Sequence, residues 1–303
     1  MKILLLGKKG QVGWELQRSL APLGELIALD HDSQDFCGDF TNIAGLAMTI
    51  KTLKPDVIVN AAAYTAVDLA ENDERLAHKI NAEAVRVLAQ EASALGALLV
   101  HYSTDYVFDG SGTKPWQETD APAPMNVYGA TKLAGEQAIL NANCKHLIFR
   151  TSWVYAARGA NFAKTMLRLA AERDSLSVID DQIGAPTGAD LLADVTAQAI
   201  SFVIKQPEVA GLYHLVARGE VSWHGYASLV IETARAAGLP IKVAADGIKA
   251  VSSEAFVTPA KRPKNSRLST NKLESTFGMR MPAWQQGVSR MLAEIMENKN
   301  GKA

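Results

Sequence analysis

The chain has 303 residues, of which 48% are hydrophobic, and its formal net charge at pH 7 is −1. This length and apolar content can bury a large core, so we expect one main domain with a smaller lobe. Because the charges nearly cancel and no basic run stands out, the composition excludes nucleic acid as an expected partner.

The chain begins with an apolar run, Lys2–Leu6, followed by a glycine-rich loop and then by an amphipathic stretch over residues 14–20. A strand, a glycine turn and a helix in this order are typical of a dinucleotide site, because glycine lets the backbone approach a pyrophosphate. The helix N-terminus adds unpaired amides. The predicted cofactor-binding residues of this loop are Gly7, Gly10, Gln11, Val12 and Gly13.

A second short strand, residues 25–30, ends on Asp30, at the distance expected for a contact with a ribose. An acid there suits the free 2′-hydroxyl of NADH, whereas Lys8 and Lys9 suit the extra phosphate of NADPH. The sequence therefore leaves both cofactors open. Asp30 could equally be a turn residue.

Further apolar runs predict strands over residues 55–60, 95–103, 146–150 and 211–216. Helical periodicity covers residues 73–95, 128–140, 161–173 and 189–205. This alternation predicts an α/β fold, a doubly wound parallel Rossmann sheet with a smaller mixed α/β substrate-binding lobe. We assign residues 1–150 and a returning segment, about 187–219, to the dinucleotide-binding domain. Residues 151–186 and 220–303 form the predicted second lobe.

Neither the cysteines nor the apolar runs indicate a secreted or membrane protein. Cys37 and Cys144 lie far apart, which predicts neither a disulfide framework nor a metal clip. The first apolar run is too short for a signal peptide, and no segment is long and apolar enough to span a bilayer. We therefore expect a cytoplasmic protein without a membrane partner.

Tyr128 and Lys132 are spaced so that both side chains lie on one face of a helix. A phenol, with a pKa of roughly 10, is a poor acid or base at neutral pH. A nearby ammonium favours the phenolate and lowers that pKa, so the pair can exchange a proton with a substrate oxygen.

The glycine spacing together with Tyr-x-x-x-Lys resembles the extended short-chain dehydrogenase/reductase family. From Lys2 to about Met296, the chain resembles the dTDP-4-dehydrorhamnose reductases within it, most clearly over residues 60–68, 103–110, 128–136, 150–155 and 262–268. The resemblance implies that hydride from NADPH or NADH reduces C4 of dTDP-4-dehydro-L-rhamnose to give dTDP-L-rhamnose. This reaction is the last step of dTDP-rhamnose supply for O-antigen in lipopolysaccharide and for other cell-surface polysaccharides.

The same resemblance implies a catalytic role for Thr104, Tyr128 and Lys132. Tyr128 would supply the proton, while Lys132 would hold the phenol at a usable pKa and bind the nicotinamide ribose. Thr104 would donate a hydrogen bond to the substrate oxygen, a role for which many relatives use serine. The adjacent Ser103 is the rival, although its side chain should point to the opposite face of the strand.

The resemblance also assigns binding residues. The further cofactor contacts are Asp39, Phe40, Ala61, Ala62, Ala63, Tyr64 and Thr65. The expected substrate contacts, besides Thr104 and Tyr128, are Asp105, Trp153, Arg262 and Asn265, with Lys264 as a further donor. Arginine and amide donors suit a diphosphate.

Three acids, Glu15, Asp190 and Glu294, match positions that in some enterobacterial members surround a hydrated magnesium ion at a dimer interface. Asp190 departs from that pattern, because its side chain is one methylene shorter than glutamate. Magnesium accepts carboxylate and water ligands. The resemblance thus implies a homodimer with a structural Mg²⁺, while three unconnected surface carboxylates stay the alternative.

Two other functions share these features. An epimerase or dehydratase of sugar nucleotides has the same fold and Tyr/Lys pair, but leaves the cofactor unchanged overall. The regulatory beta subunit of methionine adenosyltransferase, a non-catalytic protein, also resembles these reductases. Intact Thr104, Tyr128 and Lys132 argue against a pure binding subunit.

Overall fold

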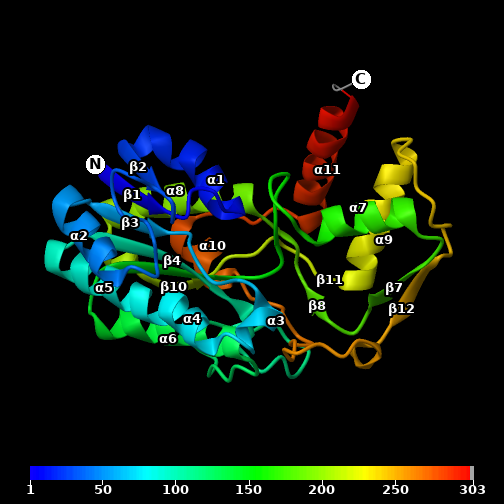
Figure 1. Cartoon of the computed structure of the whole chain (residues 1–303), viewed down its shortest axis with the longest axis horizontal. Helices are drawn as coiled ribbons and strands as arrows, with labels where there is room; N and C mark the ends of the chain where they lie inside the picture. Colours follow the sequence, from blue (N-terminus) through cyan, green and yellow to red (C-terminus); the bar gives the residue numbers. More distant parts are fainter. Residues whose placement is uncertain (301–303) are drawn as a thin grey trace.

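The centre of the computed structural model, which describes residues 1–300, is a parallel sheet of six strands in the order β10-β5-β4-β3-β1-β2 (Figure 1). The side chains from residue 298 on, and residues 301–303 of the predicted second lobe, lie outside the description. The strands of this sheet are β1 (Lys2–Leu6), β2 (Glu25–Leu29), β3 (Val57–Asn60), β4 (Leu98–Thr104), β5 (His146–Thr151) and β10 (Gly211–His214).

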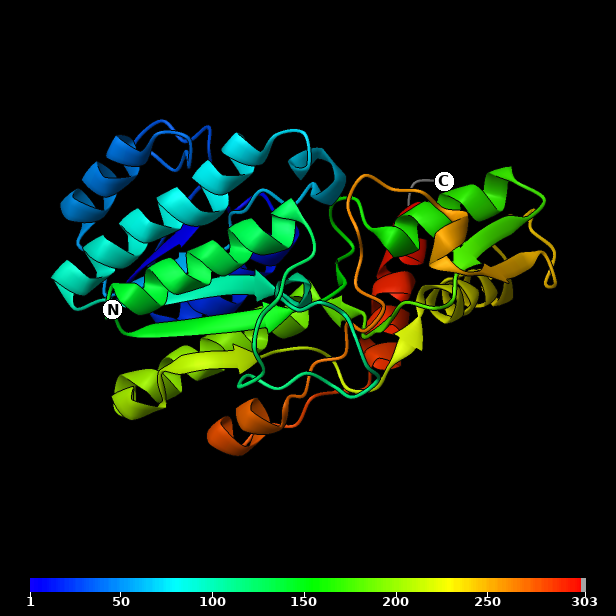
Figure 2. The ribbon, with the colours of Figure 1, turned by 90° about the horizontal axis from the view of Figure 1, so that it is seen from below.

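Helices cover both faces of the sheet, which confirms the predicted doubly wound fold (Figure 2). One face carries α1 (Gln11–Leu20), α8 (Ala189–Lys205) and α10 (Asn271–Phe277); the other carries α2 (Ile43–Leu53), α5 (Ala84–Leu95) and α6 (Val127–Asn141). Side chains alternate along a strand, so Ile3 and Leu5 pack toward α1 while Leu4 and Leu6 pack toward α2. All four are fully buried, which explains the continuous apolar run.

The order of the strands reverses at β1. β2 lies on one side of β1, and β3 and all later strands of the sheet lie on the other. A reversal of this kind opens a crevice at the carboxyl ends of the strands, where ligands of such sheets bind. The glycine loop after β1 and residues 61–65 after β3 border this crevice.

The helix predicted over residues 73–95 is interrupted. It consists of α4 (Glu74–His78), a π-helical turn (Lys79–Glu83) and α5, and a short α3 (Val67–Ala70) precedes it. Asn81, in the π-helical turn, is buried and binds both backbone groups of Tyr64, accepting from its N–H at 2.8 Å and donating to its carbonyl at 3.1 Å. The turn thus anchors the loop after β3.

A second group of helices and short strands lies beside the main sheet and its helices (Figure 1). Its helices are α7 (Phe162–Glu172), α9 (Trp223–Ala236) and α11 (Trp284–Asn300), which bury a common apolar core. Its short strands pair as β6 (Val154–Tyr155) with β9 (Thr187–Gly188), β7 (Leu176–Ile179) with β12 (Ile248–Val251), and β8 (Ile183–Gly184) with β11 (Val221–Ser222).

The boundaries of the two lobes stay a prediction. The packing of two segments, β10 and α10, shows which core each of them joins. β10, in the predicted returning segment, joins the main sheet. Leu273 and Phe277 of α10 also pack in the core of that sheet, whereas α9 and α11 pack in the second group of elements. The segment after residue 220 therefore contributes to both cores. Within residues 1–300, no helix has the length and hydropathy needed to cross a membrane.

Candidate active site

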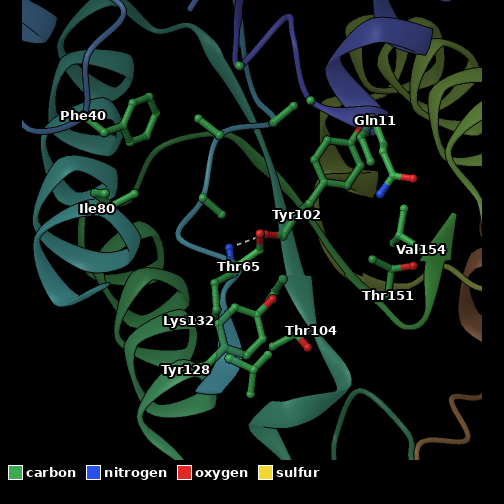
Figure 3. Close-up of a pocket in the computed structure, with 18 of the residues that line it drawn as sticks. Gln11, Phe40, Thr65, Ile80, Tyr102, Thr104, Tyr128, Lys132, Thr151 and Val154 are labelled. Carbon is green, nitrogen blue, oxygen red and sulfur yellow. Dashed lines mark hydrogen bonds between the residues drawn. The ribbon is translucent and has the colours of Figure 1, made fainter. Parts of the chain in front are cut away.

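A cleft of about 880 Å³ opens at the carboxyl ends of the strands (Figure 3). Gln11 and Val154 border one side of it, and Phe40 and Ile80 lie on the opposite side, with Tyr128 and Lys132 between them. The cleft collects most of the predicted site residues: Gly7, Gly10, Gln11, Val12, Asp30, Asp39, Phe40, Ala61, Ala62, Ala63, Thr65, Thr104, Asp105, Tyr128, Lys132 and Trp153.

Two glycines of the first loop are required by close backbone contacts. Gly7 has a φ of +87°, and a Cβ there would lie 2.7 Å from the backbone nitrogen of Ala62. A Cβ on Gly13 would lie 2.0 Å from the carbonyl oxygen of Gly7, so only glycine lets α1 start against the loop. No side chain caps α1, whose first amides therefore stay available to an anionic group.

The carboxylate of Asp30 lies at the rim of the cleft, already held by hydrogen bonds. It accepts from the backbone N–H of Lys9 at 2.9 Å and of His31 at 2.8 Å, and its Oδ1 lies 2.6 Å from Nδ1 of His31. Burial raises the pKa of Asp30, but these bonds outweigh it and hold the pKa below its usual value. The ammonium of Lys9 forms an ion pair with Asp32, two residues after Asp30.

Tyr128 stands in the first turn of α6, opposite the end of β4. The side chain of Asn126 caps this helix by accepting from the N–H of Gly129 at 2.8 Å. A Cβ on Gly129 would lie 2.2 Å from the carbonyl oxygen of Tyr106, so glycine brings the helix close to the segment that follows Thr104. Burial raises the pKa of Tyr128 to about 12, and a hydrogen bond with Thr104 opposes that rise.

Lys132 is fully buried one turn further along α6. Its Nζ donates to the carbonyl oxygen of Tyr102 at 2.6 Å and lies 3.2 Å from Nε2 of His101. Burial lowers the pKa of Lys132 to about 8. The expected lowering of the Tyr128 pKa by Lys132 is wrong for this arrangement, since burial dominates and the ammonium is directed to Tyr102.

Asp105 follows Thr104 and is 2% exposed. Its Oδ1 accepts from the Thr104 hydroxyl at 3.2 Å. Among the described residues, Oδ2 has no hydrogen bond of ordinary geometry. Burial raises the pKa of this carboxyl group to about 7, although the nearby hydroxyl of Ser266 also acts on it and lowers its pKa. An unpaired buried oxygen at the wall of the cleft can bind a ligand hydroxyl.

A second cavity, of about 850 Å³, adjoins the cleft, and Trp223 lines both. The indoles of Trp153 and Trp223 stack with 3.6 Å between ring centroids, and Trp153 has a φ of 49°, unusual for a bulky residue. Arg262 lines the second cavity and pairs with Asp68 at 2.7 Å. The lining of the cavity combines apolar side chains with three cations and two acids: Met125, Phe162, Met166, Val178, Ile179, Phe256, Val257, Lys261, Arg262, Lys264, Asp109 and Glu254.

Three predicted binding residues do not line either cavity. Gly13 is a packing position at the start of α1, and the backbone of Tyr64 is held by Asn81. The amide of Asn265, 2% exposed, donates to the carbonyl oxygens of Ser111 and Lys114. Its amide thus holds the loop of residues 111–114, and the amide donors are engaged there.

The predicted metal ligands lie on α1, α8 and α11. Burial raises the pKa of Glu15, Arg18 opposes this, and the charges of Asp190 and Glu294 raise it further, so the three acids are neighbours. Asp190 pairs with Arg290 at 3.2 Å. Among the described residues, the cluster with metal-ligand spacing is instead Asp30, His31 and Asp32. The magnesium prediction is therefore not supported by this geometry.

The sequence prediction missed four residues that build the site: Asn81, His101, Tyr102 and Trp223. Asn81 and His101 are buried polar residues inside a helix and a strand, and they carry no motif. Tyr102 contributes its backbone carbonyl, which no sequence pattern can indicate. Trp223 starts α9, about seventy residues after the tryptophan on which it stacks.

Comparison with known protein families identifies the family of this chain. The family described as "RmlD substrate binding domain" matches residues 1–297. The chain belongs to this family. A dTDP-4-dehydrorhamnose reductase from Salmonella typhimurium is 62% identical over 296 residues, which are 97% of this chain and 98% of the relative. The reductase of the same name from Shigella flexneri is 61% identical over 295 residues, with 97% and 98% of the two chains covered.

Solved structures of the family agree with the fold. A dTDP-4-dehydrorhamnose reductase from Bacillus anthracis, solved in complex with NADP, is 36% identical with a TM-score of 0.85 over 97% of this chain and 99% of that one. The structure of a dTDP-4-dehydrorhamnose reductase from Clostridium acetobutylicum gives 36% identity and a TM-score of 0.87, covering 98% and 100% of the two chains. The predicted family and the Rossmann-type sheet are thereby confirmed.

Proposed function

We propose that the chain is a dTDP-4-dehydrorhamnose reductase, which reduces dTDP-4-dehydro-L-rhamnose to dTDP-L-rhamnose with a nicotinamide cofactor. The observation that carries the proposal is the near-complete match to reductases of that name, with Thr104, Tyr128 and Lys132 gathered in the cleft. Supply of dTDP-L-rhamnose for O-antigen is the wider role that we propose.

The cleft suits a nicotinamide dinucleotide. Its backbone amides at the start of α1 would hold the pyrophosphate, Asp30 the adenosine ribose, and Phe40 and Asp39 the adenine. The bound cofactor supplies a hydride, which is the one part of the chemistry that the side chains lack. Lys132 would bind the nicotinamide ribose with Nζ, which in this structure donates to the carbonyl oxygen of Tyr102.

The second cavity suits the nucleotide part of the substrate. Its apolar walls can hold a thymine, and the cations of Lys261, Arg262 and Lys264 can neutralise a diphosphate. A diphosphate would compete for two of them with the carboxylates of Asp68 and Asp181, which now pair with Arg262 and Lys264. Trp223 lines both cavities, so a sugar attached to that diphosphate would reach the cleft over the stacked pair Trp153 and Trp223. We therefore propose that the substrate lies across both cavities.

The side chains then perform the proton part of the reduction. As the carbonyl carbon is reduced, negative charge develops on its oxygen, and Thr104 and Tyr128 can place two hydroxyl donors on that oxygen. Tyr128 gives its proton, because a phenol with a pKa of about 12 is fully protonated at neutral pH. Asp105, beside Thr104, can accept a hydrogen bond from a sugar hydroxyl.

The test is reduction of a panel of dTDP- and UDP-linked 4-keto sugars, followed as loss of nicotinamide absorbance and product identity. We expect stoichiometric oxidation of the cofactor with dTDP-4-dehydro-L-rhamnose. Epimerised or dehydrated product without net cofactor oxidation would contradict reduction and favour a sister enzyme. Absence of any turnover, with cofactor and substrate bound, would favour a regulatory subunit.

The choice between NADH and NADPH is open, and we propose that both support turnover. The carboxylate of Asp30 suits the free 2′-hydroxyl of NADH. Lys9 and His31, whose backbone N–H groups bind Asp30, carry basic side chains that suit the 2′-phosphate of NADPH. The ratio of kcat/KM for the two cofactors measures the preference. A chain that accepts only one of them would contradict this proposal.

We also propose a homodimer in which Glu15, Asp190 and Glu294 meet a divalent cation. The support is their mutual proximity, through which Asp190 and Glu294 act on the pKa of Glu15. Arg290 would have to release Asp190, since the two now pair. Chelation should then weaken association and lower Tm, with reversal by magnesium. Unchanged sedimentation and melting in chelator would contradict the metal and leave the reductase proposal intact.

A further inference from the structure

Behind Lys132 lie two buried side chains, those of Asn60 and His101, to which the sequence prediction gives no role, and together with Lys132 they form a chain of polar contacts. Asn60 ends β3, His101 lies in β4 and Lys132 in α6, and they are 1%, 1% and 2% exposed. Nδ2 of Asn60 is 3.0 Å from Nδ1 of His101, and Nε2 of the same ring is 3.2 Å from Nζ of Lys132. Polar groups buried this deeply depend on each other for hydrogen bonds.

The orientation of the Asn60 amide is fixed by the backbone. Its Oδ1 accepts from the N–H of Ala62 at 3.0 Å, so its Nδ2, which can only donate, faces Nδ1 of His101. Nδ1 must therefore accept this hydrogen bond and carry no proton. Turning the amide over would place two donors, Nδ2 and the Ala62 N–H, against each other.

The ring of His101 is neutral. Burial lowers its pKa well below the usual value, and Lys132 acts in the same direction whenever it is protonated. A neutral imidazole with a bare Nδ1 carries its single proton on Nε2. That N–H points along the 3.2 Å contact to Nζ of Lys132.

The Nε2–H of His101, which faces Nζ of Lys132, discriminates between the charged and the neutral form of Lys132. An ammonium has three donors and no acceptor, so it cannot take a hydrogen bond from His101. A neutral amine can accept from Nε2–H and still donate to the carbonyl oxygen of Tyr102 at 2.6 Å. The contact is therefore favourable only for the uncharged form.

We propose that Asn60 and His101 are positioning residues which hold an N–H donor against Nζ of Lys132 and thereby favour its neutral amine. Burial acts in the same direction, because it lowers the pKa of Lys132 to about 8. The opposing group is Glu136 of α6, whose charge is largely taken up by bonds of 2.9 and 2.6 Å from Arg150. Tyr128 is the next titratable group before Lys132 on the same helix, and among the described residues no other charge than those of Lys132 and Glu136 acts on the pKa of His101 or Lys132.

The assignment goes beyond the proposed function, because it concerns the state of Lys132 before any ligand binds. Binding at the ribose site would compete with His101 for Nζ, and withdrawal of Nζ from the ring would restore the ammonium. Above about pH 8 the cofactor-free protein thus keeps Lys132 uncharged, and binding at the ribose site would restore its charge.

The first test needs no substitution. ¹⁵N-detected NMR of the cofactor-free protein distinguishes the two tautomers of a neutral histidine and follows the titration of Lys132 through its side-chain signals. We expect the Nε2-protonated tautomer for His101 and a neutral Lys132 above about pH 8. The Nδ1-protonated tautomer would overturn the proposal.

The second test uses a double-mutant cycle. His101→Phe keeps a ring but removes the N–H, so the Lys132 titration should move up by about one unit, the size of a hydrogen bond of ordinary net strength. Asn60→Asp should reverse the tautomer, because a carboxylate accepts from Nδ1–H and leaves Nε2 to accept from the ammonium, which again raises the titration.

The charge introduced by Asn60→Asp also acts on Lys132 directly, and the double variant Asn60→Asp/His101→Phe measures that part alone. We expect Asn60→Asp to raise the titration less in the His101→Phe background than in the natural one. Equal shifts in both backgrounds, or an unchanged titration in His101→Phe, would overturn the tautomer assignment. These readings do not depend on turnover, so failure of the proposed reductase activity would be seen separately.

Discussion

Replacing Tyr128 by phenylalanine removes one hydroxyl and keeps the ring. The ring contacts Tyr106 edge-on with 5.7 Å between centroids, and this contact survives the substitution. The hydroxyl that is lost has a hydrogen bond with Thr104. One such bond contributes about 1 kcal/mol to the free energy of unfolding, so Tm should fall by a few degrees at most.

The effect on turnover should be far larger. Loss of a general acid lowers kcat by roughly 100- to 10,000-fold, which corresponds to about 2.7–5.4 kcal/mol of activation free energy. The affinity for the cofactor should barely change, because the phenol serves the substrate oxygen. The assay is single-turnover reduction under saturating cofactor, with cofactor binding measured separately by titration.

Tyr102→Phe is the matched control. Its hydroxyl is also paired with a threonine, Thr196 of α8, at 2.7 Å, and its loss should cost a similar amount of stability. Only the Tyr102 backbone carbonyl contacts Lys132, and the substitution leaves it in place. A Tyr128→Phe variant with the turnover of Tyr102→Phe would refute the role of Tyr128 as proton donor.

Three further predictions concern neighbouring residues. Thr104→Val should lower kcat roughly 100-fold through loss of an oxyanion donor, while Thr104→Ser should stay near the natural rate; equal rates for both would remove Thr104 from the mechanism. Asp30→Ala should raise the NADPH-to-NADH ratio of kcat/KM roughly tenfold by removing repulsion of a 2′-phosphate, and an unchanged ratio would mean that Asp30 does not face the ribose. The folded-state pKa of Asp105, about 7, lies above its usual value, so its contribution to stability is complete at low pH and is lost as the pH rises through 7. Asp105→Asn should therefore raise the free energy of unfolding above pH 7 by up to about 4 kcal/mol, measured by urea titration, and show a flatter pH dependence; parallel profiles would contradict the burial argument.

The elements that the sequence predicts well are those whose pattern reflects local physics. Strands that are buried on both faces, such as β1 with its fully buried residues 3–6, appear as uninterrupted apolar runs. Ala189–Lys205 is a helix over the predicted residues. The Tyr128/Lys132 spacing correctly places both residues in the cleft, because α6 is regular from its Asn126 cap onward. Local periodicity is enough for such features.

Features that depend on distant contacts escape the sequence. The π-helical turn at residues 79–83 exists because Asn81 reaches the loop after β3, and no helical periodicity indicates it. The phenol pKa was expected to fall through Lys132, but Nζ lies on the carbonyl of Tyr102 instead. An amide at residue 265 suits a diphosphate by its chemistry, while in this structure it donates to the carbonyl oxygens of a loop. Each of these differences concerns which partner a polar group finds in three dimensions.

The left-handed backbone of Trp153 carries a consequence for protein engineering. A bulky residue at a φ of 49° costs of order 1–3 kcal/mol, and the indole offsets that cost by stacking on Trp223 and by packing on the apolar core of α7, α9 and α11. Glycine at this position would relieve the backbone strain but lose the packed indole, and truncation of a core tryptophan costs about 3–5 kcal/mol. Directed evolution for thermal tolerance should therefore retain residue 153 just as selection for turnover does, and a thermostabilised catalyst needs its stabilising substitutions elsewhere.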